Sequence, residues 1–405
     1  MPRESLLSRS FLLSFAAHFL HALAFNLFLH LPGFLKRLGA AEVAIGLIIG
    51  ASAAVAVFAR PLMGAVIDRR GSRPVILVGG LLHAIACALY LTVGTLGPWL
   101  YVVRVVHGAA GAMIFVSLFA FAASIVPASR RIEGIALFGV SGMLPMSFGG
   151  LLGDIVLAHA PYQVLFAVSA ALSLAALAIS LPLRDPGTRP AEPPSGRSWL
   201  GAARAAGLLP IWMVAMIFGA AVAAPFTFLK TFVMATGIGS VGLFFTVYSL
   251  TAVALRLVAG SLPDRVGPTR VLLPALLLGG LGLGLLAHTH GSAEMAVAGL
   301  LCGFSHGFAF PILVGLLVAR APIASRGASY AVFTALWDVG AMTGAPLFGL
   351  IIQGAGYPPM FATAAVLVLA GALAFALWDR RAPVCGPRAG PPSSTSRQTP
   401  GIDGA

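Results

Sequence analysis

The sequence predicts an all-α polytopic membrane protein whose twelve transmembrane helices form two pseudo-symmetric six-helix bundles. Apolar residues make up 59% of the 405 residues and charged residues only 9%, whereas soluble domains carry roughly 25% charged residues. Apolar runs of about 20 residues, enough to cross a ~30 Å hydrocarbon layer as a helix, recur along the chain. A charged segment of the first half also returns in the second half, which indicates that the halves are related.

The repeated segment is a charged connection between two apolar runs. Residues 64–73 read Gly-Ala-Val-Ile-Asp-Arg-Arg-Gly-Ser-Arg, and residues 260–267 read Gly-Ser-Leu-Pro-Asp-Arg-Val-Gly. The shared positions lie 196 residues apart, and Arg60 recurs as Arg256 at the same interval. A repeat of nearly half the chain length predicts two similar units.

Twelve apolar runs account for most of the chain, with ends uncertain by several residues. A β-structure is excluded because the runs are too long for strands and lack a period of two. The expected spans lie near 11–31, 42–66, 75–95, 98–122, 132–157, 162–183, 208–233, 240–262, 271–288, 294–319, 327–352 and 359–378.

Basic residues between the runs indicate the orientation. With the N-terminus inside, nineteen arginines fall on inner segments, and only Lys36, Arg37 and Lys230 fall on outer ones. Because Lys and Arg collect on cytoplasmic loops, both termini are predicted to be cytoplasmic. The expected location is the plasma membrane, which is the inner membrane in a Gram-negative cell.

Polar segments divide the chain into four predicted parts. Residues 1–183 and 208–379 are the two six-helix bundles. Residues 184–207, rich in Pro and Gly, are predicted to form a cytoplasmic linker because these residues oppose regular structure. Residues 380–405 are expected to be a disordered cytoplasmic tail.

Composition and motifs exclude several classes of function. The net charge of +13 does not predict nucleic-acid binding, because basic residues gather on the inner loops of membrane proteins. No Gly-x-x-x-x-Gly-Lys-Ser/Thr loop occurs, so ATP is not the direct energy source, and no nucleophile–base pair indicates an enzyme. Cys87, Cys302 and Cys385 show no metal-binding spacing. No cofactor is expected, and no metal ligands are claimed.

Two six-helix halves, a cytoplasmic linker and the doubled Gly-x-x-x-Asp-Arg-x-Gly segment resemble the major facilitator superfamily. The resemblance covers about residues 10–380 and implies alternating access, in which two bundles rock around a central site. A second family motif is matched by Arg104-Val-Val-His107-Gly108, with His107 where the family usually has Gln. In proton-coupled relatives this arginine takes part in proton movement, so the resemblance implies that role for Arg104.

A third family motif, in the fifth span, marks exporters of drug-like compounds. Residues 142–150 read Gly-Met-Leu-Pro-Met-Ser-Phe-Gly-Gly, so the usual Gly-Pro pair is split and the match is partial. It weakens the inference of drug–proton antiport. Pro145, Gly149 and Gly150 still predict a helix bend that is useful for gating.

Asp338 is the sharpest candidate for chemistry because it is expected about 16 Å inside the eleventh span. An ionisable group at that depth costs several kcal/mol unless it faces a cavity or a partner. We interpret it as a proton- or cation-binding carboxylate; the alternative is a structural salt bridge to Arg104 or Arg256. For Arg104, the alternative to a functional role is a hydrogen-bonding anchor between helices. Arg60 and Arg256 are expected to have a structural or gating role.

Four histidines add to the candidate cavity. His18 and His21 are three residues apart on one face of the first span, and His107 and His306 each precede a glycine. Imidazole titrates near neutral pH and binds protons, metals or anions. The alternative for each histidine is polar contact between helices. Asp154 and Glu42 receive little weight, since they are expected near the outer surface.

The predicted function is transport of a small organic solute by alternating access, as proton-coupled efflux. The expected partners are the solute, protons and the lipid bilayer, and the chain is expected to act as a monomer. Proton-linked uptake of a sugar or carboxylate, and a membrane sensor that transports nothing, remain open.

The repeated charged segment is expected to act as a gate separate from the binding site. Asp68 can accept hydrogen bonds from a helix N-terminus of the opposite half, favoured by the helix dipole, and Gly71 permits a tight turn. The second copy is expected to be weaker because Pro263 and Thr269 interrupt it. The predicted gating residues are Gly64, Asp68, Arg69, Gly71, Arg73, Gly260, Asp264, Arg265 and Gly267.

Overall fold

The computed structural model describes residues 6–185, 201–322 and 325–379. Every regular element of these residues is helical, and twelve spans among them are long and apolar enough to cross a membrane. The twelve predicted spans are therefore confirmed. The predicted tail (380–405) and most of the predicted linker (186–200) lie outside the described residues.

The N-terminal half, defined as helices α1 to α7, contains six spans. The first is built from three consecutive pieces and is longer than expected, because the chain stays helical to Arg37. The elements are α1 (Arg9–Asn26), η1 (Leu27–His30), α2 (Leu31–Arg37), α3 (Glu42–Arg70), α4 (Ser72–Leu89), η2 (Tyr90–Thr92), α5 (Pro98–Ile125), η3 (Ala128–Arg130), α6 (Arg131–His159) and α7 (Tyr162–Ser180).

The C-terminal half, defined as helices α9 to α15, contains the other six spans. It differs from the first half in one extra short helix, α11, which holds the second copy of the charged segment. The elements are η4 (Ala206–Leu208), α9 (Leu209–Thr236), α10 (Val241–Val258), α11 (Leu262–Val266), α12 (Pro268–Ala287), α13 (Ser292–Arg320), α14 (Arg326–Ala355) and α15 (Tyr357–Asp379).

Local sequence explains where several helices begin and end. The hydroxyl of Ser8 accepts a hydrogen bond from the first turn of α1, and that of Ser240 does so for α10, as N-cap residues do. Helix α3 continues through Pro61 to Arg70 and ends at Gly71, whose backbone has a φ of 83°. Such positive φ values favour glycine. Most of the segment 64–73, expected as a connection, is therefore helix.

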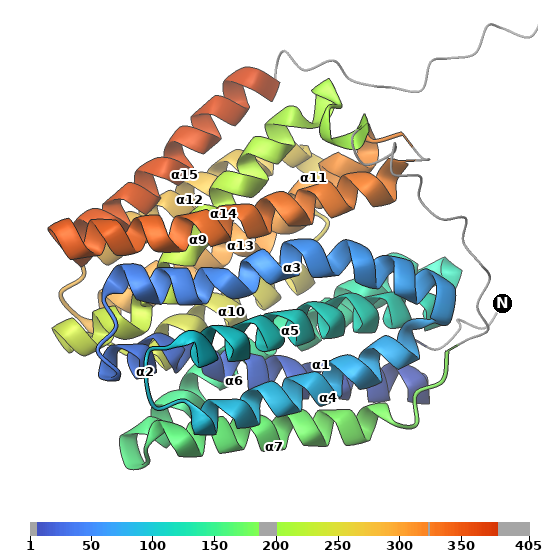
Figure 1. Cartoon of the computed structure of the whole chain (residues 1–405). Helices are drawn as coiled ribbons and strands as arrows, with labels where there is room; N and C mark the ends of the chain where they lie inside the picture. Colours follow the sequence, from blue (N-terminus) through green and yellow to red (C-terminus); the bar gives the residue numbers. More distant parts are fainter. Residues whose placement is uncertain (1–5, 186–200, 323–324, 380–405) are drawn as a thin grey trace, which may run out of the picture.

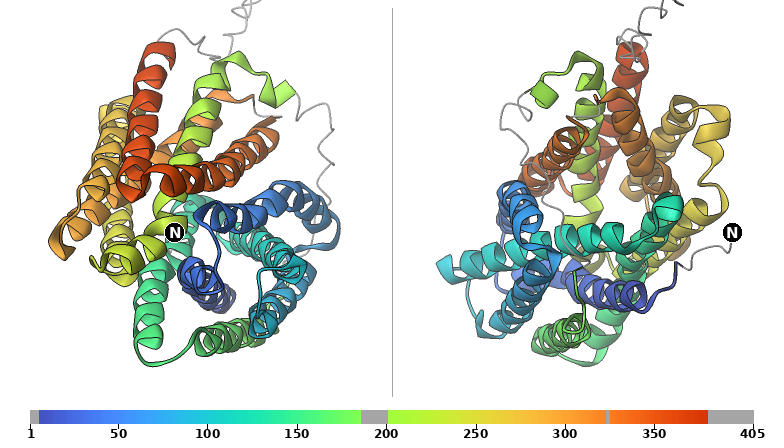
Figure 2. Two further views of the ribbon diagram at one scale, coloured as in Figure 1. Left: turned by 60° about the vertical axis from the view of Figure 1, so that its left-hand side comes forward. Right: turned by 90° about the vertical axis from the view of Figure 1, so that its right-hand side faces the viewer.

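The two halves meet along two helix pairs, α3 with α14 and α6 with α10. Figures 1 and 2 show the N-terminal half (blue to green) beside the C-terminal half (yellow-green to red). Glycines bring the backbones together: a Cβ added to Gly46 would lie 2.7 Å from Pro346 Cα, and one added to Gly150 would lie 3.1 Å from Gly242 Cα. In lipid, such small residues allow the close packing that holds helices together.

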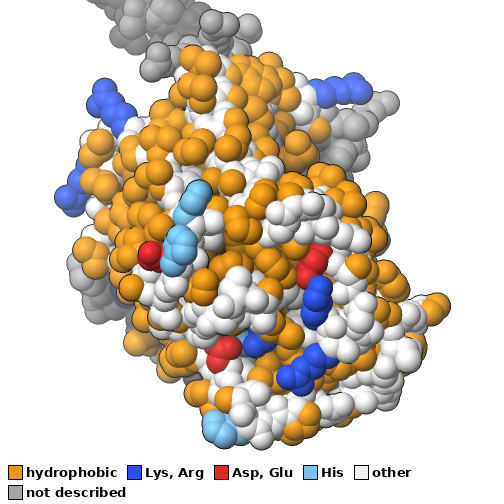
Figure 3. All heavy atoms as spheres, turned by 90° about the vertical axis from the view of Figure 1, so that its left-hand side faces the viewer, with side chains coloured by type: hydrophobic (Ala, Val, Ile, Leu, Met, Phe, Trp, Pro, Cys, Tyr) orange, Lys and Arg blue, Asp and Glu red, His pale blue; other side chains and the backbone are white. Residues whose placement is uncertain are grey.

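The contacts between the halves are unequal at the two ends of the molecule. We call the end where α1 begins and α15 stops the terminal end, and the opposite one the far end, shown face-on in Figure 3. At the far end a Cβ on Gly349 would lie 2.8 Å from Val43 Cα, whereas one on Gly64, near the terminal end, would meet nothing within 4 Å. Figure 1 shows α3 and α14 diverging in that direction. The structure is thus closed at the far end.

Candidate functional site

Asp338 forms an ion pair with Arg60 of the opposite half. Arg60 Nη1 lies 2.7 Å from Asp338 Oδ2, and the exposed fractions of the two side chains are 25% and 10%. The pair is close but poorly aligned, since Asp338 Oδ2 and Arg60 Nε have no hydrogen-bond partner among the described residues. The Arg60 guanidinium also lies 5.6 Å from the centre of the Phe115 ring. One carboxylate thus links α14 to both α3 and, through Arg60, α5.

The partner of Asp338 differs from the two arginines that the sequence suggested. Arg104 and Arg256 were the expected partners, but the crossing of α3 and α14 brings Arg60 to the carboxylate instead. Asp338 itself lies twelve residues from the start of α14, about 18 Å along the helix. Its depth in the span is therefore close to the expected one.

Arg104 is a buried anchor between three elements. Its Nε donates to the carbonyl of Ile48 (3.1 Å), and its Nη2 donates to Ser52 Oγ (2.6 Å) and to the carbonyl of Ile49 (3.3 Å). Its Nη1 donates to Tyr90 Oη at 3.3 Å. A guanidinium occupied in this way ties α5 to α3 and η2, which matches the anchor alternative for Arg104.

Arg256 is the repeat counterpart of Arg60 but has no carboxylate. No acid of the described residues forms an ion pair with it, and its Nε has no hydrogen-bond partner there. Its guanidinium points toward α6, since a Cβ on Gly139 would lie 3.9 Å from Arg256 Nη1. Residues 134–153 of α6 contain no Asp or Glu. Within the part of the chain that the structure describes, Arg256 is therefore a cationic group without a counter-charge.

His306 lies in an aromatic wall next to this arginine. Its Nδ1 is 2.5 Å from Tyr248 Oη, and its ring centre lies 5.8 Å from that of Trp337 and 5.9 Å from that of Phe218. The side chain of His306 is partly exposed. Of the four predicted histidines, this is the one placed among aromatic groups at the surface of its half.

The other three predicted histidines are buried inside the N-terminal half. His18 Nδ1 lies 2.7 Å from Ser141 Oγ, and its ring stacks on Phe138. His21 Nδ1 lies 3.4 Å from His83 Nδ1, and His107 has an exposed fraction of 0%. For His18 this matches polar contact between helices. His21 and His107 belong to a larger cluster.

That cluster contains a set of residues that could hold a metal ion. One ligand atom each from His83, Cys87 and His107 lie within 4.8 Å of one another, and all three residues are buried. His83 was not among the candidate residues of the sequence, and Cys87 was expected to have no metal-binding spacing. The missed signal is the interval of four residues between them, which places both side chains on one face of α4.

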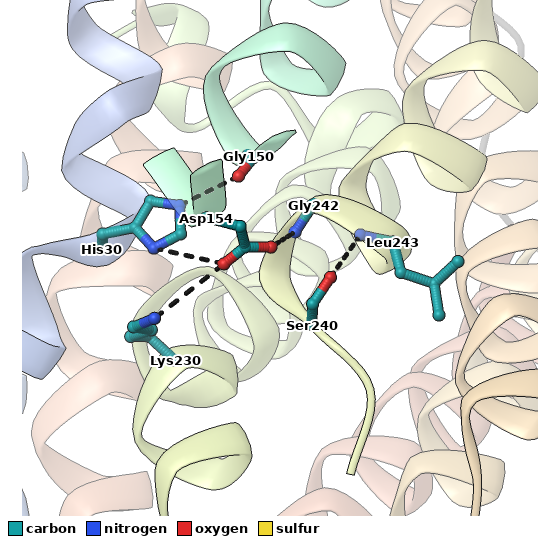
Figure 4. A network of polar contacts seen from close by, with 7 residues as sticks. All are labelled: His30, Gly150, Asp154, Lys230, Ser240, Gly242 and Leu243. Atoms are coloured by element: carbon teal, nitrogen blue, oxygen red, sulfur yellow. Dashed lines mark hydrogen bonds and ion pairs between the residues drawn. The ribbon is translucent and has the colours of Figure 1, made fainter. Parts of the chain in front are cut away.

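Asp154 is the centre of a polar network that joins the halves at the far end (Figure 4). Its Oδ2 accepts a hydrogen bond from the Gly242 N–H at 2.6 Å, and its Oδ1 lies 3.9 Å from Lys230 Nζ and 3.8 Å from His30 Nδ1. His30 Nε2 lies 3.1 Å from the carbonyl of Gly150. The carboxylate faces the N-terminal end of α10, where the helix dipole favours negative charge.

A second far-end contact is centred on Glu42. Its Oε1 accepts hydrogen bonds from Lys36 Nζ at 2.7 Å and from Tyr357 Oη at 2.9 Å, so it joins α2 and α3 to α15. A pocket of about 490 Å³ lies beside it, lined by Lys36, Thr231 and Tyr357 among others. Asp154 and Glu42, given little weight from the sequence, are thus the two acids that link the halves at the far end.

We expect Asp154→Asn to weaken closure of the far end. Asn can still accept the hydrogen bond from Gly242, but it lacks the negative charge that faces Lys230 and the N-terminus of α10. The loss of this charge should destabilise the closed far end by about 0.3–2 kcal/mol. The labelling rate of a cysteine at Ser147, which is 3% exposed and lies 3.2 Å from Thr246 of α10, should rise 2- to 20-fold with a membrane-impermeant thiol reagent. Glu294→Gln, at the exposed end of α13, is the control; equal labelling in both would contradict this.

The predicted gating residues at the terminal end contact their own half or solvent. The side chains of Asp68, Arg69, Asp264 and Arg265 are exposed. Arg73 instead donates to the carbonyls of Leu183 (2.6 Å) and Leu181 (3.1 Å). Asp185, which no motif in the sequence marks, accepts hydrogen bonds from the N–H groups of Ser72 and Arg73.

The glycines of this gate differ in their surroundings. Gly71 and Gly267 have φ values of 83° and 106°, so Gly71 has the backbone conformation expected of its predicted turn, and Gly267 has a similar one. A Cβ on Gly64 would meet no atom within 4 Å, whereas one on Gly260 would overlap the carbonyl oxygen of Arg256. In this conformation Gly64 therefore faces open space.

The predicted bend of the fifth span lies within the continuous helix α6, with Pro145 inside it. Gly149 and Gly150 allow close packing of α6 against its neighbours. A Cβ on Gly149 would lie 2.7 Å from Asn26 Cβ, and Gly150 approaches Gly242 of the opposite half. These glycines thus lie where α6 crosses α1 and α10.

Comparison with known proteins identifies the family. The family description Major Facilitator Superfamily matches residues 11–242 and 211–400. A staphylopine export protein of Staphylococcus aureus (strain Mu50) is 24% identical over 357 residues, which cover 85% of this chain and 89% of that protein. An uncharacterized MFS-type transporter of Burkholderia mallei (strain SAVP1) is 25% identical, covering 88% of each chain.

Solved structures support the same fold. A variant of the nucleoside transporter NupG superposes with a TM-score of 0.76 at 15% identity, covering 91% of this chain and all of that one. A POT family transporter in complex with 5-aminolevulinic acid gives a TM-score of 0.79 at 13% identity, covering 92% and 96%. With twelve spans, charge pairs between the halves and a family match over nearly the whole length, this chain belongs to the major facilitator superfamily and is a membrane transporter of a small solute, not an enzyme.

Proposed function

We propose that this transporter exports a small organic solute in exchange for protons, with Asp338 as the group that binds the proton. The observation that carries the proposal is the Arg60–Asp338 ion pair, which spans the two halves deep in the membrane. Protonation of the carboxylate removes its charge and leaves Arg60 as an unpaired cation. Because an unpaired charge in the membrane interior costs several kcal/mol, proton binding would change the relative stability of the two conformations.

The two halves pack closely at the far end and separate at the terminal end. This difference supports an assignment of the side of the membrane that the conformation faces. With both termini in the cytoplasm, as the arginine distribution predicts, the far end is outside and the structure faces the cytoplasm. Asp154 and Glu42 then form the outer gate. The proposed units are the bundles 1–183 and 208–379, and a monomer contains both gates and the ion pair.

Arg256 supports a substrate with an anionic group. It is the counterpart of Arg60, lies opposite an α6 segment without acids, and is partly exposed. A carboxylate or phosphate on the substrate would supply the missing counter-charge, and bidentate binding to guanidinium adds specificity. The rings of Phe218, Trp337 and His306 would face the apolar part of such a molecule, as pocket-lining aromatic groups commonly do.

Export is the proposed direction because the similar Staphylococcus aureus protein is named an export protein. A screen of solutes in a deletion strain and an overexpressing strain would first identify the cargo. Uptake of that cargo into everted vesicles, driven by a pH gradient that is acidic inside, then tests the proposal. Accumulation of the cargo in right-side-out vesicles instead would establish uptake. A transport rate that does not change with the imposed pH gradient would exclude proton coupling.

A membrane sensor that transports nothing is the second candidate. It predicts that both the Arg60–Asp338 ion pair and the hydrogen bonds of Arg104 are dispensable. At equal expression, unchanged function in both Asp338→Asn and Arg104→Ala would favour the sensor over the transport mechanism.

We expect Asp68→Asn to slow transport while leaving substrate affinity within about twofold. The Asp68 carboxylate is exposed and has no ion-pair partner among the described residues in this conformation. It would bind a helix N-terminus of the C-terminal half when the terminal end closes, an interaction of about 0.3–1 kcal/mol. Comparing the maximal rate with the apparent Kd in proteoliposomes measures this. A large loss of affinity with unchanged cycling would count against a gating role.

A further inference from the structure

The cluster inside the N-terminal half is built like a metal site. His83 and Cys87 come from α4 and His107 from α5, and their ligand atoms lie within 4.8 Å of one another. Exposed fractions are 1%, 0% and 0%. Ligands around a metal ion at 2.0–2.3 Å are separated by less than this distance, so small side-chain rotations would suffice.

Unpartnered nitrogens point to a missing ligand. The Nε2 atoms of His83 and His107 are buried and have no hydrogen-bond partner among the described residues. A buried polar atom left in this state costs about 1–3 kcal/mol. Two such atoms beside a buried thiol are better explained by an ion than by apolar packing.

Each of the three residues also has a hydroxyl beside it. Ser173 Oγ lies 2.8 Å from His83 Nδ1, Tyr90 Oη lies 3.4 Å from His107 Nδ1, and Ser169 donates to Cys87 Sγ at 3.2 Å. In the tautomer that frees Nε2 for a metal, each Nδ1–H donates to its hydroxyl oxygen. Metal-bound histidines usually have such an outer hydrogen bond, which orients the ring.

We propose that His83, Cys87 and His107 bind one Cu⁺ ion. Soft thiolate ligands favour Cu⁺ or Zn²⁺. Cu⁺ with one thiolate and two neutral imidazoles carries no net charge, whereas Zn²⁺ with the same ligands keeps one positive charge, which is costly inside a membrane. Structural Zn²⁺ also takes four ligands. His21 lies next to His83, with 3.4 Å between their Nδ1 atoms, but within the described ranges only His83, Cys87 and His107 have ligand atoms that all lie within 4.8 Å of one another.

The site belongs to the architecture of one half and not to the proposed transport path. The three ligands are buried within α4 and α5, and the ion would join these two helices. Tyr90 connects the site to the Arg104 anchor, because its hydroxyl accepts from Arg104 Nη1 at 3.3 Å. Bound copper would therefore stabilise the part of the N-terminal half that packs against α3.

The test is anaerobic titration of the purified, detergent-solubilised protein with Cu⁺ alone, in competition with a chromophoric Cu⁺ chelator. All samples carry Cys385→Ser, because Cys385 lies outside the described residues. We expect one Cu⁺ per chain, and X-ray absorption should show one sulfur and two nitrogen ligands. Cys87→Ser should weaken binding at least 100-fold, and Ser173→Ala, which keeps the ligands, 10- to 100-fold.

Cys302→Ser is the matched control, since Cys302 is a buried thiol of the C-terminal half, and it should leave binding unchanged. Cys87→Ala gives a second variant that keeps a small apolar group at this buried position, and it should also lose the ion. Equal loss in the Cys87 and Cys302 variants, no stoichiometric Cu⁺ in the parent, or tighter binding of Zn²⁺ in a parallel titration would each overturn the proposal.

Discussion

Replacing Asp338 with Asn is expected to abolish solute transport driven by a pH gradient, with a loss of at least 100-fold. The amide cannot take up a proton and cannot compensate the charge of Arg60, which lies 2.7 Å away. Without the carboxylate, the Arg60 cation has no counter-charge in the conformation that holds this pair. Breaking a buried ion pair in this way destabilises that conformation by about 3–5 kcal/mol. Transport of the identified cargo in proteoliposomes, with and without an imposed pH gradient, measures the effect.

Asp379→Asn is the matched control. Asp379 is also paired with an arginine, Arg320, and is little exposed, but the pair lies within the C-terminal half at the terminal end. We expect this variant to retain pH-driven transport to within a few fold. Asp338→Glu should keep part of the coupling because it keeps a carboxylate. If Asp338→Asn transports and couples as well as the Asp379 variant, the proton-binding role of Asp338 is wrong.

Gly46→Ala is expected to shift the protein away from the conformation that is closed at the far end. The added Cβ would lie 2.7 Å from both the carbonyl carbon of Ala345 and the Cα of Pro346. These are backbone atoms that cannot rotate aside, so α3 and α14 must separate. Overpacking of this kind costs about 1–3 kcal/mol, which corresponds to a population shift of about 5- to 150-fold.

The labelling rate of Ser147→Cys, with Cys385 replaced by Ser, reports this shift from the far end. Gly315→Ala is the control, because a Cβ there would meet nothing within 4 Å. We expect faster labelling in the Gly46 variant and an unchanged rate in the Gly315 variant. Slower labelling in the Gly46 variant would mean that the far end opens by a movement other than separation of α3 and α14.

The spans could be predicted from the sequence because membrane insertion is a local requirement. A run of about 20 apolar residues must satisfy its backbone hydrogen bonds as a helix, whatever its neighbours are. The bounds of α14 and the depth of Asp338 follow from this. Local rules also predicted the turn at Gly71, whose positive φ favours glycine. The end of α3 was placed too early, because the charged residues up to Arg70 do not themselves break a helix.

The partners of the polar groups could not be predicted in the same way. Arg60 was expected only to have a structural or gating role, but the glycine-lined crossing of α3 and α14 places it beside Asp338. Asp154 received little weight because it was expected near the outer surface. The packing of α10 places the Gly242 N–H within hydrogen-bonding distance of its carboxylate. Such contacts depend on which helices are neighbours and on their rotation, and a single sequence contains neither.

Hydropathy, repetition and charge placement are properties of the chain alone, and they were enough to predict a twelve-span, two-half membrane protein with one deep carboxylate. The tertiary structure decided that Arg60 neutralises that carboxylate, that Asp154 and Glu42 close the far end, and that Cys87 meets His83 and His107. The physical reason is that charges, thiols and imidazoles act over a few ångströms, and only helix packing sets distances on that scale between residues far apart in the chain.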